Sequence, residues 1–125
     1  MDIVEANRLV TEINNYLQKA LWFDFEIKKY ADLELVIHGG ISLYQGTDIE
    51  IIFKDVFYMS LPTDWSSDTS KVVLLVKESI DLRYSDPKFK ETYFHYVFEF
   101  IAEDYPGITC EIRAKTVAYK ILKPI

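Results

Sequence analysis

Apolar residues recur at spacings of three and four over the first twenty positions of the chain. This spacing predicts an α-helix with one apolar face. Asp2 lies just before the first apolar residue and Glu5 follows it three positions later, as in a capping box at a helix start. We therefore expect one amphipathic helix over about residues 2–20 that packs on the rest of the protein. Its apolar stripe consists of Ile3, Ala6, Leu9, Val10, Ile13, Tyr16, Leu17 and Ala20.

After the helix the spacing of apolar residues changes to two. Apolar and polar residues alternate at 23–28, 33–38 and 49–54. Alternation is typical of a strand with one face on a core and the other in water. Further extended segments are expected at 55–61, 71–76, 92–103, 108–114 and 117–122.

Several segments between these strands lack a regular pattern. Residues 63–70, with the sequence TDWSSDTS, are mostly small and polar and predict a loop after Pro62. Residues 41–44 lie between glycines and indicate a short strand. The continuous apolar run at 71–76 is typical of a strand covered on both faces. A short strand or turn is expected at 79–84, a loop at 86–87, and a hairpin turn at the DYPG sequence of 104–107.

The order of these elements predicts an α+β fold. Strands do not alternate with helices along the chain, so a parallel sheet is not expected. We expect the N-terminal helix to pack on a curved or part-closed antiparallel sheet of about seven or eight strands spanning about residues 22–122. A chain of 125 residues is typical of one domain, so the expected unit is 1–125.

The net charge of −6 is concentrated in the first part of the chain. Residues 1–70 contain twelve Asp and Glu against five Lys and Arg, whereas residues 71–125 contain eight against nine. An acidic chain repels phosphate backbones, which disfavours nucleic acid as a partner and favours a basic protein. The start of the chain lacks the features of a signal peptide, and no apolar run reaches the length of a membrane helix. We therefore expect a cytoplasmic protein of bacterial type with no membrane contact and an unknown oligomeric state.

Residue patterns typical of catalysis are weak in this sequence. His38 and His95 are the natural general bases, but their spacing does not match a zinc motif. Cys110, the one cysteine, excludes an intramolecular disulfide and falls on the apolar side of its expected strand, where a thiol is inert. We expect no cofactor and no metal. An enzyme that uses His38 with nearby carboxylates remains an alternative.

Four carboxylates occupy the polar positions of strands that we expect to be neighbours. They are Asp24, Glu26, Glu34 and Glu50. On one exposed sheet face they would attract a basic partner, and they would equally make an ordinary solvated face. Tyr58, Asp64 and Trp65 are candidate partner-binding residues at the rim of that face, because Tyr and Trp suit interfaces. In a structural interpretation, which the turn after Pro62 favours, Asp64 instead caps that turn and Trp65 covers the sheet edge.

The stretch IEIIFKDVFYMSLPTDW, residues 49–65, resembles a pattern in small bacterial proteins of toxin-immunity type. In that pattern a strand of the type I-E-I-x-F leads into a second strand and then a polar-aromatic loop containing proline. The resemblance supplies no catalytic residue and implies a binding function. The sequence thus predicts a non-catalytic, immunity-like interaction protein that binds a basic protein. A small-ligand-binding protein with a cavity between helix and sheet is a further alternative.

Overall fold

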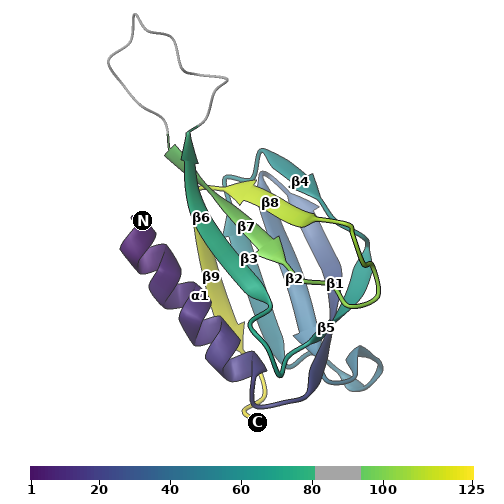
Figure 1. Cartoon of the computed structure of the whole chain (residues 1–125). Helices are drawn as coiled ribbons and strands as arrows, with labels where there is room; N and C mark the ends of the chain where they lie inside the picture. The colour runs from purple at the N-terminus through teal and green to yellow at the C-terminus, as the bar shows by residue number, and fades with distance from the viewer. Residues whose placement is uncertain (81–93) are drawn as a thin grey trace, which may run out of the picture.

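The computed structural model of the chain describes residues 1–80 and 94–125, which contain one α-helix and two β-sheets (Figure 1). The α-helix is α1 (Ile3–Leu17), and a short 3-10 helix, η1 (Leu43–Gln45), lies between β2 and β3. The strands are β1 (Trp22–Ala31), β2 (Glu34–Gly40), β3 (Ile49–Lys54), β4 (Tyr58–Ser60), β5 (Asp64–Asp68), β6 (Leu74–Ile80), β7 (Phe94–Phe100), β8 (Cys110–Ala114) and β9 (Thr116–Ile121).

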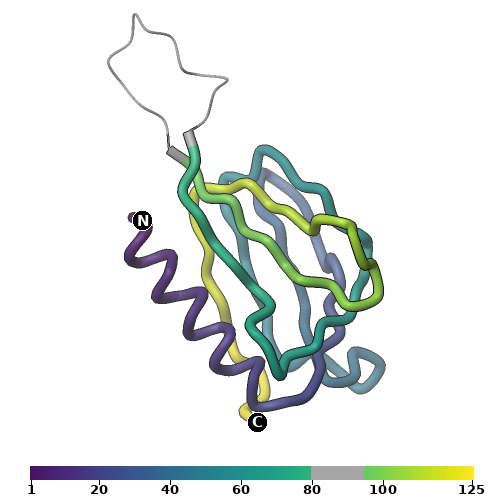
Figure 2. Tube along the Cα trace, in the orientation of Figure 1, coloured from purple at the N-terminus to yellow at the C-terminus, as the bar shows by residue number. Residues whose placement is uncertain are grey.

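The nine described strands divide between a five-stranded sheet, ordered β5-β1-β2-β3-β9, and a four-stranded sheet, ordered β4-β8-β7-β6. Every neighbouring pair is antiparallel. The expected α+β class and antiparallel pairing are confirmed, but the expectation of one curved sheet is wrong. The chain leaves the five-stranded sheet after β3, returns for β5, leaves again for β6 and returns for β9, as Figure 2 shows. Two sheets bury each other's apolar faces, which a single open sheet cannot do.

Aromatic side chains from both sheets meet in the core. The ring of Phe25 on β1 lies 5.3 Å from that of Phe100 on β7, and the ring of Phe53 on β3 lies 5.0 Å from that of Phe98 on β7. All four side chains are fully buried or nearly so. The alternating residues of the expected strands therefore point inward as predicted, and they fix which residues of each strand remain on the outer faces.

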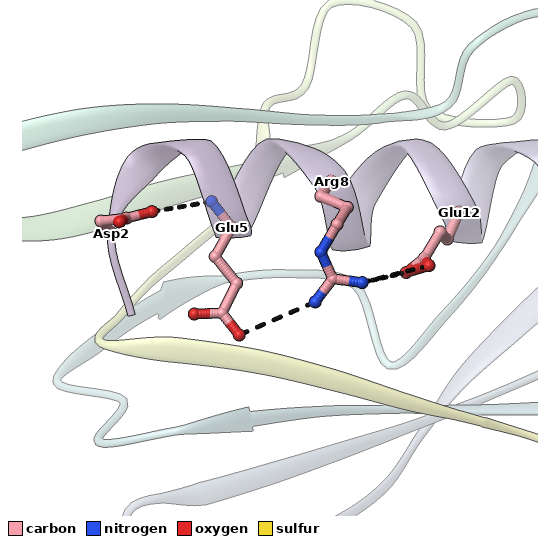
Figure 3. A network of polar contacts seen from close by, with 4 residues as sticks. All are labelled: Asp2, Glu5, Arg8 and Glu12. Atoms are coloured by element: carbon pink, nitrogen blue, oxygen red, sulfur yellow. Dashed lines mark hydrogen bonds and ion pairs between the residues drawn. The ribbon is translucent and has the colours of Figure 1, made fainter.

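Helix α1 lies along one side of the two sheets, where it contacts the edge strands β6 and β9 (Figure 1). Asp2 is its N-cap, and the Asp2 carboxylate accepts a hydrogen bond of 2.8 Å from the amide of Glu5. Figure 3 shows the Arg8 side chain between those of Glu5 and Glu12. The Arg8 guanidinium lies 3.2 Å from the Glu12 carboxylate and 3.8 Å from that of Glu5. The predicted helix is confirmed, although it ends at Leu17 rather than near residue 20.

Asn14 fastens α1 to the start of β6 and is buried, although it is polar. Its side-chain nitrogen donates to the carbonyl of Leu74 at 2.8 Å. Its side-chain oxygen accepts from the amides of Val73 and Leu74, each at 3.1 Å. Because β6 is an edge strand, these backbone groups have no neighbouring strand on that side, and the carboxamide takes its place.

Three local expectations are wrong. Residues 41–44 do not form a strand, because the chain turns through η1 there. The expected loop at 63–70 contains β5, an edge strand paired with β1. The run at 71–76 is not covered on both faces, since Leu75 is exposed. The expectations for residues 81–84 and 86–87 lie outside the described part of the chain.

The hairpin between β1 and β2 turns through two residues with positive φ, Asp32 at 52° and Leu33 at 63°. Two positive φ values are characteristic of a type I′ turn, whose twist matches that of the flanking strands. Asparagine and glycine tolerate this conformation best, whereas a leucine there is strained. The turn joins β1 directly to β2, and this adjacency brings the polar residues of the two strands together.

Candidate functional site

One row of polar residues crosses the whole outer face of the five-stranded sheet. Directly paired positions place Asp64 on β5 beside Glu26 on β1, Glu26 beside His38 on β2, and His38 beside Glu50 on β3. Lys120 on β9 pairs with Glu50 and ends the row. Residues that pair directly across antiparallel strands project to the same face. The fold therefore aligns three carboxylates, an imidazole and an ammonium group on five neighbouring strands.

The outward orientation of this row follows from the alternation in each strand. Phe25, Ile37 and Ile51 are fully buried neighbours in sequence of Glu26, His38 and Glu50. Asp24 lies two residues from Glu26 on β1, and Glu34 lies four residues from His38 on β2. Both therefore project from the same outer face. The four predicted carboxylates thus share one face, as expected. They are half-buried rather than fully exposed.

These four carboxylates do not form one compact group. Glu34 lies four residues before His38 on β2, which corresponds to about 13 Å along a strand. Lys54 on β3 and Lys29 on β1 also project from this face, on the side of the row toward Glu34. We therefore define the acidic surface as Asp24, Glu26, Glu50 and Asp64, and leave Glu34 outside it.

His38 is held by hydrogen bonds at both ring nitrogens. Its Nε2 lies 3.0 Å from Oε2 of Glu50, and its Nδ1 lies 3.0 Å from Oγ1 of Thr47. An ionised carboxylate only accepts hydrogen bonds, so Nε2 carries a proton when Glu50 is ionised. In the neutral ring Nδ1 then accepts from the Thr47 hydroxyl. Contacts on both sides fix the orientation of the imidazole within the row.

Hydrogen bonds also order the β5 side of the acidic surface. The Ser66 hydroxyl donates to Asp24 at 2.7 Å, and the Ser66 amide donates to Asp104 at 3.0 Å. Further along β5, hydrogen bonds from the hydroxyl and then the amide of Ser70 lower the pKa of Asp68 below its ordinary value. Asp68 pairs with Trp22 at the start of β1, and the ammonium group of Lys71 lies 3.6 Å from the Asp68 carboxylate.

Two of the candidate residues lie elsewhere. Trp65 is only 1% exposed and its ring lies 5.6 Å from Phe25 and 5.2 Å from Phe100, so it cannot contact a partner. Trp65 therefore lies in a strand and fills the core between the two sheets, rather than covering the sheet edge from a loop. Tyr58 is exposed on the outer face of the four-stranded sheet, where the guanidinium of Arg113 lies 5.7 Å from its ring centre. That face points away from the acidic surface.

Trp22 was missed as a candidate, although it is 51% exposed on the same face as Asp24 and Glu26. Its Nε1 donates a hydrogen bond of 3.0 Å to the carbonyl of Ile41, which holds the indole in place. The signal was present in the sequence, because extending the alternation of 23–28 back by one residue puts Trp22 opposite Phe23. Trp22 supplies an aromatic side chain at the edge of the acidic surface.

In the part of the chain that the structure describes, Cys110 and His95 lie far apart and do not form a second reactive centre. Burial and then the charges of Asp104 and Glu99 raise the pKa of the Cys110 thiol, in agreement with its expected low reactivity. Cys110 pairs with Phe100, five residues from His95 along β7, or about 17 Å. The two therefore form no nucleophile–base pair. Within residues 1–80 and 94–125, no group of three His, Cys, Asp or Glu side chains could hold a metal ion.

A groove of about 240 Å³ lies between α1 and β6, away from the acidic surface. Its helix side presents the uncharged polar side chains of Asn7, Thr11, Asn15 and Gln18, and its strand side presents valine and leucine. The groove is open to solvent and not a closed cavity between helix and sheet. It is nevertheless the feature that corresponds to the small-ligand alternative.

Comparison with models of known protein families finds no match, and comparisons with curated proteins and with solved structures find none either. Among the described residues, no helix is both long and apolar enough to cross a membrane.

Proposed function

We propose that this protein is a non-catalytic interaction protein that binds a basic protein partner through the acidic surface of its five-stranded sheet. The observation that supports this function most directly is the alignment of Asp64, Glu26 and Glu50 on one outer face. Negative charge on one face steers a positively charged partner toward it and selects its orientation. An immunity-like role in the cytoplasm, in which an acidic protein neutralises a basic toxin, is the form of this function that the sequence resemblance favours.

Trp22 strengthens the proposal, because an exposed and fixed indole beside carboxylates suits an arginine-bearing surface. Tryptophan buries a large area at low entropic cost, and arginine stacks on its ring. The hydrogen bond from Trp22 to Ile41 means that little side-chain freedom remains to be lost on binding. The aromatic ring of Trp22 next to the carboxylates matches the enrichment of aromatic residues in protein interfaces.

Charge reversal tests this function. Glu26→Lys with Asp64→Lys alters two directly paired carboxylates, and Glu5→Lys with Glu78→Lys is the matched control. Glu5 lies on α1 and Glu78 on β6, the edge strand of the four-stranded sheet that α1 contacts. Each pair changes the net charge from −6 by four units to −2.

The probe is a labelled ten-residue peptide of alternating arginine and glycine, and its binding is measured by fluorescence anisotropy at low and high salt. We expect the Glu26/Asp64 reversal to weaken binding by roughly tenfold or more at low salt, since each reversed charge acts at close range. The Glu5/Glu78 control should change it by less than about threefold. Equal weakening in both pairs would show that only net charge matters and would refute the site.

The groove between α1 and β6 supports a second candidate function, the binding of a small uncharged ligand. The polar side chains on the helix side of the groove can hydrogen-bond a ligand, and the valine and leucine side chains of β6 can bury its apolar part. A fragment screen by NMR, with shifts followed at Asn7 and Gln18, tests this function. Fragments that shift these residues no more than the rest of the surface would refute it.

A further inference from the structure

His38 occupies the centre of the row of polar residues on the five-stranded sheet and faces charged groups on both sides. Glu26 on β1 and Glu50 on β3 are its direct neighbours across the sheet. Asp64 lies beyond Glu26, and Lys120 lies beyond Glu50. With a neutral imidazole the row carries three negative charges and one positive charge, a net of −2. A proton on His38 changes this sum to −1.

The hydrogen bonds around His38 suit both protonation states of the ring. In the neutral ring, Nε2–H donates to Glu50 and Nδ1 accepts from the hydroxyl of Thr47. After a second proton binds at Nδ1, the same hydroxyl can rotate and accept through its oxygen lone pairs. Neither state leaves a ring nitrogen without a partner. The local structure therefore tolerates the change in charge without rearrangement.

Histidine is the side chain whose charge ordinarily changes between about pH 5 and 8. We infer that His38 makes the acidic surface pH-sensitive, so that a basic protein partner binds less tightly when His38 is protonated. This regulation rests on the proposed function, because it acts through the same surface. The inference requires that protonation of His38 lower the affinity for the basic partner while the fold stays intact.

The binding test uses the arginine–glycine peptide at pH 7.5 and 5.5 and constant ionic strength, because arginine does not titrate in this range. The native protein should bind the peptide roughly three- to fivefold less tightly at pH 5.5, the effect of one unit charge at close range in a solvent-like dielectric. His38→Gln keeps a neutral group that can donate a hydrogen bond to Glu50. The affinity of this variant for the peptide should therefore differ by less than about 1.5-fold between pH 7.5 and pH 5.5. Equal weakening in the native protein and in His38→Gln overturns the inference.

NMR supplies a readout that does not depend on any partner. The Cε1 proton of His38, assigned by its absence in His38→Gln, should shift between pH 8 and 5.5 while the amide spectrum of the fold stays unchanged. A His38 signal that does not move in this range overturns the inference.

Failure of the proposed function gives a different result from failure of the pH sensitivity. A peptide affinity that is unchanged in the Glu26→Lys/Asp64→Lys variant would refute the acidic surface as the binding site. Binding that responds to the reversal, yet weakens equally with pH in native protein and His38→Gln, overturns the role of His38 alone.

Discussion

Asn14→Ala tests whether the hydrogen bonds of the Asn14 side chain to the backbone at the start of β6 stabilise the fold. In the native protein this amide makes three hydrogen bonds, of 2.8, 3.1 and 3.1 Å, to the backbone of Val73 and Leu74. Alanine removes all three and leaves two amides and one carbonyl without that partner. Asn15 is the matched control, because it is the next residue of the same helix and is exposed.

The magnitude follows from the three lost hydrogen bonds. A typical intramolecular hydrogen bond contributes about 1 kcal/mol net, and an unsatisfied buried group costs about 1–3 kcal/mol. Water can reach some of these groups through the open groove beside β6, which limits the loss. We therefore expect Asn14→Ala to lower the free energy of unfolding by about 2–4 kcal/mol. For a domain of this size that corresponds to a fall in melting temperature of about 8–16 °C.

Urea and thermal unfolding, followed by circular dichroism and by tryptophan fluorescence, measure this change. Alanine favours helix at both positions, so the difference between Asn14→Ala and Asn15→Ala isolates the contacts with β6. Asn14→Asp loses the donor and places a charge at a buried site, so it should be at least as destabilising as alanine at neutral pH. Unfolding energies for Asn14→Ala and Asn15→Ala that agree within about 0.5 kcal/mol would refute the reasoning.

Three further predictions concern stability. Ile13→Asp should unfold the domain, because Ile13 is fully buried in the middle of the α1 stripe, and an unchanged melting temperature would contradict this. Leu33→Gly should raise the free energy of unfolding by about 0.5–1 kcal/mol by relieving the positive φ of 63° in the hairpin turn, whereas a loss measured by urea unfolding would count against strain there. Burial and then the charge of Asp48 raise the pKa of Tyr16, so folding favours its protonated phenol. That contribution is present below about pH 10 and is lost as pH rises through the raised pKa, so Tyr16→Phe should show a shallower fall in melting temperature between about pH 9.5 and 11 than the native protein, and equal falls would refute the assignment.

The parts of the fold that the sequence predicted correctly depend on local periodicity. The α1 stripe and the alternation in β1, β2 and β3 each follow from the geometry of a single element. Ile13 and Leu17 are fully buried as the helical spacing requires, and Phe25 and Ile37 are fully buried as the strand spacing requires. The same periodicity put the carboxylates on the outer face, because their buried neighbours determined the phase.

Strand β5 was missed because its tertiary contacts override its composition. Four of its five residues are Ser or Asp, which favour turns when considered alone. Pairing with β1 and the burial of Trp65 hold the segment extended. The free edge of β5 is then covered by the 101–104 segment, whose Glu103 amide donates to the carbonyl of Ser66 at 2.7 Å. None of these partners is near in sequence, so local propensity could not reveal the strand.

The division into two sheets explains which candidate residues the sequence placed correctly. Alternation determines whether a side chain points inward or outward, but it does not determine which sheet a strand joins. Glu26 and Glu50 share a surface because β1, β2 and β3 are consecutive neighbours in one sheet. Tyr58 also points outward, yet the chain crosses to the other sheet after Asp55, which adopts a positive φ of 56°. An outward residue therefore lies on the same outer face as the acidic surface only if its strand belongs to the five-stranded sheet. Trp22 and Asp64 meet this condition, whereas Tyr58 does not.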